Sequence, residues 1–290
     1  MSLLGGINYI SSHGTAQGII TRFFLHFEEM GKFAFLGDNE RKAKYLKYEV
    51  RLMEDFTNFY DTYYEILDLR AEYIQGIENG MYFSAFPDGR TTSDKTPEIK
   101  LRRRIMEFFI SGSQLLNKFC KSKLLDDGAF KLSLFLLSKD DVVEKYLKST
   151  QGKFKFKNGY KKIVDIAKDA QNDFKRDFMQ LRADLEHSYD TSILPFSIAV
   201  NGSTIVIVEP SHNGTNIFKL IDRYYNGTLN LIEDTAAYFY GINACSKSYG
   251  QITLFKRMGE VNPAKFKYRY TITLDVGDPD LQRLITPAKR

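Results

Sequence analysis

The sequence predicts a mainly α-helical protein, in which a helical bundle is followed by a smaller α+β portion. Three observations point to this class. Apolar residues recur at steps of three and four over several long segments, which is the spacing of one helical face. After Pro195 the pattern changes to short β-branched segments separated by turn residues. The chain has 290 residues, of which 43% are hydrophobic and 27% charged, so it can bury a full core.

The predicted helices before Pro195 are separated by breaks rich in Gly, Pro, Asp and Asn, such as residues 79–97. They cover residues 18–36, 40–76, 97–121, 130–137 and 139–148, and a last helix runs from residue 160 into residues 181–187. Pro195 ends this last helix at the latest, because proline removes a backbone donor and clashes within a helix.

The portion after Pro195 is expected to hold a hairpin, a helix and two further strands. The hairpin turns at the pair Asn201 and Gly202, which is typical of a two-residue connection. These elements cover residues 196–208, 216–244, 251–255 and 266–274. We therefore expect three parts: a helical extension over residues 1–38, the helical bundle over residues 39–195 and the α+β portion over residues 196–290. The last two parts could instead share one core.

Composition and motifs exclude several classes of protein. Cys120 and Cys245 lie far apart and form no CxxC pair, which fits a reduced, cytoplasmic compartment. There is neither a signal peptide nor an apolar run long enough to span a membrane, so we expect no membrane association. The GxxxxGK[ST], HExxH and GxSxG motifs are missing, and the four histidines are dispersed. We expect no cofactor and no metal.

The clearest chemistry lies in residues 181–187, at the end of the last predicted helix of the bundle. This segment places Arg182 five residues before His187. A guanidinium binds and neutralises a phosphate through a planar fork of donors, and an imidazole moves protons at neutral pH. Together the two side chains supply most of what metal-free cleavage of a phosphodiester needs.

An Arg-x4-His segment late in a helical bundle resembles the HEPN superfamily, and the resemblance covers residues 40–195. It implies a metal-independent ribonuclease that works as a homodimer. His187 would act as general acid or base toward the ribose 2′-hydroxyl or the leaving 5′-oxygen, and Arg182 would hold the scissile phosphate. Asp184 or Glu186 would orient the histidine. Ala183 follows the arginine, where active members often carry a polar residue.

Helix geometry limits how these two side chains can meet. Residues five apart on a helix are rotated by about 140° from each other, so Arg182 and His187 of one straight helix cannot meet one phosphate. Either the helix bends or ends near Asp184, or a second subunit completes the site. The same residues also have a purely structural interpretation. Arg182 and Glu186 have the spacing of a surface ion pair, and a histidine in the last turn is favoured by the helix dipole.

Basic residues provide candidate RNA contacts, and the net charge of +5 with a pI of about 8.9 permits them. They form two groups, Lys100, Arg102, Arg103 and Arg104 in a predicted helix, and Lys153, Lys155 and Lys157 alternating with phenylalanines. The alternatives are a solvated helix surface for the first group and an edge strand protected by lysines for the second.

The function predicted from these observations is metal-independent endoribonuclease activity at a dimer cleft. A role as a toxin or defence effector, with an antitoxin as partner, follows only from the family resemblance. The alternative is a catalytically inactive module that binds nucleotides or RNA, or a scaffold that binds a partner.

Overall fold

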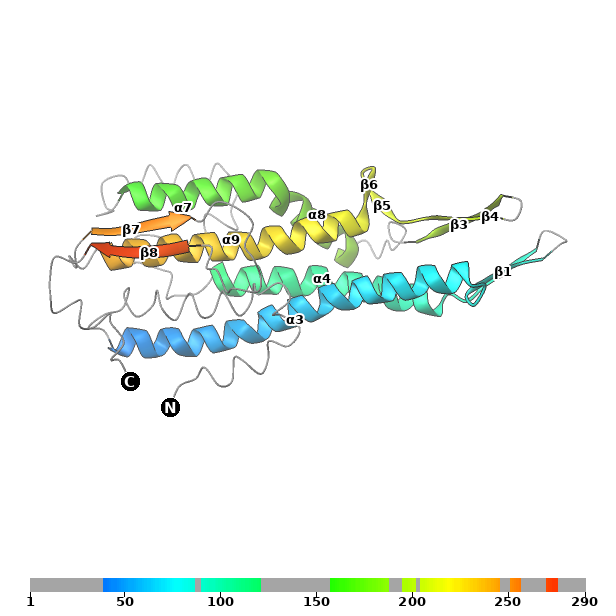
Figure 1. Ribbon diagram of the computed structural model, residues 1–290, viewed down its shortest axis with the longest axis horizontal. Coiled ribbons are helices and arrows are strands. Elements are labelled where there is room, and N and C mark those ends of the chain that lie inside the picture. The colour runs from blue at the N-terminus through cyan, green and yellow to red at the C-terminus, as the bar shows by residue number, and fades with distance from the viewer. Residues whose placement is uncertain are drawn as a thin grey trace. The chain divides into compact units, whose positions relative to one another are not determined.

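The computed structural model shows a mostly helical chain with a few small antiparallel strand pairs (Figure 1). It describes residues 39–86, 90–120, 157–187, 195–201, 204–245, 251–256 and 270–275. The predicted helices over residues 18–36, 130–137 and 139–148 lie outside these ranges.

The long helices follow the predicted apolar spacing closely. They are α3 (Asn39–Glu78), α4 (Thr96–Cys120), α7 (Lys157–Ala170), α8 (Arg176–His187) and α9 (Ile217–Cys245). Between α7 and α8 the helix widens into a π-helical turn, η2 (Gln171–Lys175), which the sequence did not predict. The helices predicted over residues 40–76, 97–121 and 216–244 are therefore confirmed to within two residues at each end.

The strands form four separate two-stranded antiparallel sheets. They are β1 (Phe83–Ala85), β2 (Thr91–Ser93), β3 (Ser197–Asn201), β4 (Thr204–Val208), β5 (Ser211–His212), β6 (Thr215–Asn216), β7 (Gln251–Lys256) and β8 (Tyr270–Asp275). The predicted hairpin is confirmed as β3 and β4, but Asn201 pairs with Thr204. The two connecting residues are therefore 202 and 203, one residue later than predicted. The β1–β2 pair lies within the predicted loop over residues 79–97.

The described residues belong to two compact units, and the boundary between the units falls within the long helices. One unit holds residues up to 54, residues 117–170 and residues from 229 onward, and the other holds residues 55–116 and 171–228. The second unit thus combines segments from both sides of Pro195. Phe196, which follows that proline, is buried against Tyr73 and Phe218. Residues on both sides of Pro195 thus pack together at this point.

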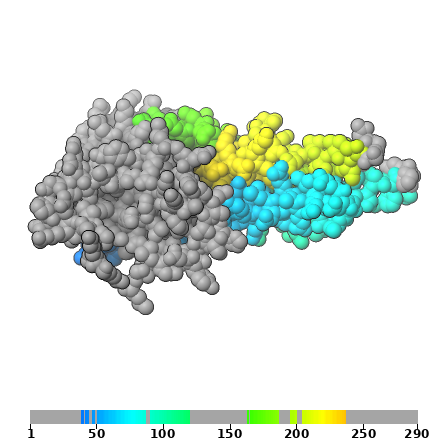
Figure 2. Space-filling view, viewed as in Figure 1, coloured from blue at the N-terminus to red at the C-terminus, as the bar shows by residue number. Residues whose placement is uncertain are grey.

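Aromatic side chains form the core of the second unit. Phe59 of α3 stacks on Phe108 of α4 at 4.8 Å between ring centroids, and Tyr63 stacks on Tyr225 of α9 at 4.0 Å. The outer surfaces of α3 and α9 meet in Figure 2, where α3 is cyan and α9 yellow. Burial raises the pKa of Tyr225, and the nearby tyrosines raise it further. These contacts fix α3, α4, α8 and α9 against one another within this unit.

A glycine allows the π-helical turn to pack closely on α9. A Cβ atom added at Gly227 would lie 2.7 Å from the ring of Phe174, which belongs to η2 and is buried. No side chain larger than hydrogen fits at position 227 without displacing that ring.

In the residues described, the first unit buries apolar side chains of α7 and α9. Ile163 and Ala167 of α7 are buried, as are Leu229, Ile232 and Ala236 of α9. Their spacing of three and four residues within each helix explains why these two helices each have one buried face.

Candidate functional site

Helix α8 carries the segment singled out in the sequence. Phe178, Leu181 and Leu185 are buried and define the core face of this helix. Arg182 lies beside that face and is half-buried. The amphipathic spacing of the three apolar residues therefore positions Arg182 at the edge of the aromatic core.

The hydrogen-bond donors of the Arg182 guanidinium have acceptors only in part. Its Nη2 donates to Oε2 of Glu186 at 2.6 Å, with 30% of the arginine side chain and 24% of the glutamate side chain exposed. Its Nε is buried and has no hydrogen-bond partner in the part of the chain that the structure describes. A buried donor without an acceptor costs about 1–3 kcal/mol. An anion can reach this guanidinium only through the 30% of the side chain that is exposed. The ion pair that the structural interpretation anticipated is present.

The helix that carries the two candidate residues does not end near Asp184. It is α-helical from Arg176 to His187, and the carboxylate of Asp184 accepts a hydrogen bond from the Gln180 side chain at 2.8 Å. An early helix end at Asp184, one of the arrangements expected from the sequence, is therefore wrong. The side chain of His187 lies outside the described atoms. Completion of the site by a second copy remains a prediction.

The first basic group lies on α4 and is largely ion-paired. Arg102 binds the buried carboxylate of Glu98, and Arg104 binds Glu65 of α3 at 2.7 Å and also Glu107. Among the described residues, Lys100 and Arg103 form no such pair. Two of the four predicted RNA contacts, Arg102 and Arg104, are thus already paired with carboxylates. Glu98 and Glu107 lie at helical spacing from these arginines, whereas Glu65 on another helix could not be assigned from the sequence.

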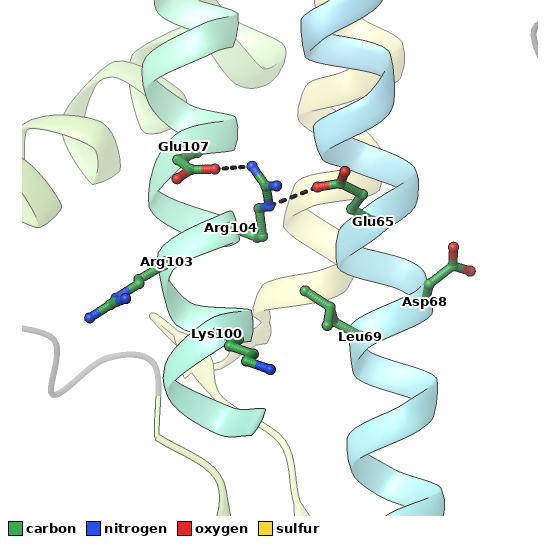
Figure 3. Close-up of a pocket in the computed structure, with 7 residues that line it drawn as sticks. All are labelled: Glu65, Asp68, Leu69, Lys100, Arg103, Arg104 and Glu107. Carbon is green, nitrogen blue, oxygen red and sulfur yellow. Dashed lines mark hydrogen bonds and ion pairs between the residues drawn. The ribbon is translucent and has the colours of Figure 1, made fainter. Parts of the chain in front are cut away.

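An open pocket of about 450 Å³ lies between α3 and α4 beside these residues (Figure 3). It is lined by Glu65, Asp68, Leu69, Lys100, Arg103, Arg104 and Glu107. Arg104 lies across it between the two glutamates, while Arg103 extends away from α3. Acidic and basic side chains are equally numerous in this lining, so the pocket itself has no excess of positive charge.

The second basic group is only partly within the structure. Lys153 and Lys155 lie outside the described residues. Lys157 is the first residue of α7, so at this position the alternative of an edge strand is wrong. Residues 158 and 159, which precede the predicted helix start at residue 160, belong to the first turn of α7.

A buried polar cluster around Glu98 was not predicted. Glu98 is fully buried in the first turn of α4. Its carboxylate accepts hydrogen bonds from the Tyr73 hydroxyl at 3.1 Å, the Lys95 amine at 3.0 Å and the Phe196 backbone N–H at 3.3 Å, and it also pairs with Arg102. Burial alone would raise the pKa of Glu98, but the hydrogen bonds from Arg102 and Lys95 outweigh it and lower that pKa. A glutamate early in a helix gives no sequence signal for such burial.

Comparison of the chain with protein families, with curated proteins and with solved structures finds no match. None of the helices described is long and apolar enough to cross a membrane. Over the same ranges, no group of three or more His, Cys, Asp or Glu side chains is arranged to hold a metal ion.

Proposed function

We propose that the chain is a metal-independent endoribonuclease of HEPN type in which Arg182 and His187 act on the phosphodiester. The observation that supports this most is the state of Arg182. Its side chain is at the edge of the aromatic core, 30% exposed, and one buried guanidinium N–H lacks an acceptor among the described residues. A phosphate oxygen is the acceptor that such a donor binds best.

The chemistry assigned to the two residues is an internal transfer. His187 removes the proton from the ribose 2′-hydroxyl, or supplies a proton to the departing 5′-oxygen, while the 2′-oxygen bonds to phosphorus. The bond from phosphorus to the 5′-oxygen breaks, which leaves a 2′,3′-cyclic phosphate and a 5′-hydroxyl. Arg182 stabilises the negative charge that grows on the equatorial oxygens. For this, the guanidinium of Arg182 releases the carboxylate of Glu186 and binds the phosphate instead.

A second copy of the chain is part of this proposal. Because α8 is continuous to its last residue, its positions 182 and 187 are rotated by about 140° from each other. We propose that Arg182 of one copy and His187 of the other face the same phosphate across a twofold axis.

Lys100 and Arg103 are the basic residues of α4 proposed to contact the RNA backbone, because neither is ion-paired within the described residues. Replacing both with Gln should reduce the dependence of log Kd on log salt by up to about 1.4, since each single-strand phosphate contact contributes roughly 0.7. The measurement is RNA binding over a salt series. A slope that equals the wild-type slope would exclude these two residues from the RNA interface.

A second candidate is RNA or nucleotide binding without cleavage. The ion pair between Arg182 and Glu186 favours it, because this pair already neutralises the guanidinium. Ala183, in place of the polar residue often found in active members, also favours it. Under either candidate function, the chain would also be able to bind a partner protein or an antitoxin. A role as a toxin or defence effector requires RNA cleavage, so it belongs to the first candidate alone.

Cleavage of generic RNA in the presence of EDTA tests the proposal. The wild type is compared with Arg182→Ala and His187→Ala, and Arg176→Ala serves as the matched control because this arginine is exposed on the same helix. We expect cleavage that resists the chelator, ends in 2′,3′-cyclic phosphate, falls about 100-fold or more in the first two variants and is unchanged in the control.

Other results identify the alternatives. RNA binding that weakens with salt, without cleavage by the wild type, supports the second candidate and contradicts the first. Equal cleavage by all four proteins would show that the activity does not depend on Arg182 and His187.

A further inference from the structure

The hairpin of β3 and β4 has a composition unlike that of the rest of the second unit. No Asp, Glu, Lys or Arg occurs from Pro195 to Val208. All five residues of β4, from Thr204 to Val208, are β-branched. Val206 and Val208 are 43% and 54% exposed, and both belong to the few large apolar side chains that the described surface exposes. A strand that is exposed, uncharged and rich in β-branched residues pairs most readily with another strand.

Both outer edges of this hairpin are unpaired within the described residues. The sheet consists of β3 and β4 alone. Natural sheets protect such edges with lysine, proline or inward-facing charges, and β4 has none of these. Two-stranded hairpins gain independent stability when further strands are added.

The base of the hairpin is held firmly, so the strands stay extended away from the helices (Figure 1). Glu209, directly after β4, accepts hydrogen bonds from Arg70 at 2.5 and 3.0 Å and from the Asn216 side chain at 2.7 Å. Phe196, directly before β3, donates its N–H to the buried Glu98 and packs on Tyr73. These partly buried polar contacts at the base of the hairpin hold the apolar strand edge in place, which lowers the entropy lost on pairing.

The register determines which backbone groups of β4 are available. Asn201 and Thr204 flank the two-residue connection and so form a hydrogen-bonded pair, and bonded pairs alternate along the hairpin. Thr204, Val206 and Val208 therefore direct their N–H and C=O groups toward β3. Ile205 and Ile207 direct theirs to the free edge.

We propose that this free edge pairs with the same edge of a second copy of the chain, antiparallel about a twofold axis at Val206. In this register Ile205 of each copy lies opposite Ile207 of the other copy, which gives two hydrogen-bonded pairs related by the twofold axis. The two Val206 residues face each other on the axis. Every facing pair is β-branched and uncharged, so the strand is complementary to itself. A charged partner would find no counter-charge on it.

The contact proposed here is reversible and independent of salt. Pairing of five-residue edges buries less than the roughly 1,200 Å² of a stable complex, so we expect association that rises with concentration. Because the paired strands carry no charge, its strength should not change between low and high salt. The inference stands whether or not the chain cleaves RNA.

Charge variants at the twofold axis test the pairing, with sedimentation over about 10 to 500 µM protein as the readout. Val206→Lys and Val206→Glu each place like charges opposite each other, and each should weaken association by about tenfold or more. An equimolar mixture of the two should associate again, and this mixed contact should weaken with salt. Met81→Lys, at a side chain that is 71% exposed outside the hairpin, is the control and should associate like the wild type.

A second variant tests the edge itself. Ile207→Pro removes an outward N–H without removing a bond to β3, so it should abolish the association step that the hairpin forms, while any dimer joined at α8 persists, and it should leave the melting temperature within a few degrees of the wild type. The proposal is overturned if the wild type stays monomeric over the whole range. It is equally overturned if both charge variants associate like the wild type, or if their mixture does not regain the contact. None of these readouts uses RNA, so failure of the ribonuclease proposal leaves them unaffected.

Discussion

Removing the carboxylate of Glu98 should destabilise the fold more than any other single loss of charge on α4. In Glu98→Ala the Tyr73 hydroxyl and the Phe196 N–H both lose their acceptor in a fully buried place. Each buried donor left without an acceptor costs about 1–3 kcal/mol. Arg102 and Lys95 keep 24% and 51% of their side chains exposed, so water can replace the glutamate for them at little cost.

The free energy of unfolding should therefore fall by about 2–6 kcal/mol. This range contains the roughly 3–5 kcal/mol that is typical when one partner of a buried ion pair is removed. Urea denaturation followed by circular dichroism measures it. Glu107→Gln is the matched control, because this glutamate also pairs with an arginine of α4 but is 52% exposed. The control should lose less than about 1 kcal/mol.

The same site predicts a dependence on pH. The pKa of Glu98 is lowered in the folded state, so its charge stabilises the fold fully above the ordinary glutamate pKa of 4.5, and this stabilisation is lost as the pH falls through the lowered value. The difference in unfolding free energy between the wild type and Glu98→Gln should thus be largest near neutral pH and shrink below about pH 4. A loss in Glu98→Ala no greater than in the exposed control, or a difference that does not depend on pH, would refute the reasoning.

Three further predictions concern the second unit. Gly227→Ala should lower stability by about 1–3 kcal/mol, because its Cβ would press on Phe174, and a thermal melt at or above the wild-type temperature would contradict this contact. Burial raises the pKa of Tyr225 in the folded state, so it stabilises the fold below the ordinary tyrosine pKa of 10.0, and this contribution is lost as the pH rises toward the raised value. The part of the tyrosinate absorbance that Tyr225→Phe removes should therefore appear together with loss of circular dichroism, and its appearance in the folded protein would disagree. Glu186→Gln should tighten RNA binding about two- to tenfold, since it removes the carboxylate that competes with phosphate for the arginine, and unchanged affinity would show that no such competition exists.

The elements that the sequence predicted well depend on local periodicity. Leu181 and Leu185 are spaced for one helical face, and both are buried in α8. The β-branched segment Thr204–Val208, next to the turn pair Asn201 and Gly202, likewise predicted a strand. The π-helical turn was missed because Phe174 and Gly227, which accommodate it, lie on segments far apart in the chain. The β1–β2 pair was missed because its strands are three residues long and mostly exposed.

The candidate site was predictable only where its partners are close in sequence. The spacing of Arg182 and Glu186 predicts their ion pair, which the structure contains. The pair between Arg104 and Glu65, by contrast, depends on how α3 and α4 pack, so the sequence could not show which basic residues remain unpaired. Glu98 resembles an ordinary first-turn glutamate until Tyr73 and Phe196 close over it.

The ribonuclease proposal is tested most directly by mixing Arg182→Ala with His187→Ala and measuring RNA cleavage in EDTA. If each site takes its arginine from one copy and its histidine from the other, a mixed dimer contains one intact site out of two. Random exchange then makes half of the dimers mixed, so the mixture should recover about one quarter of the wild-type rate. A mixture as inactive as its two components, under conditions where mixed dimers are shown to form, would contradict a shared site.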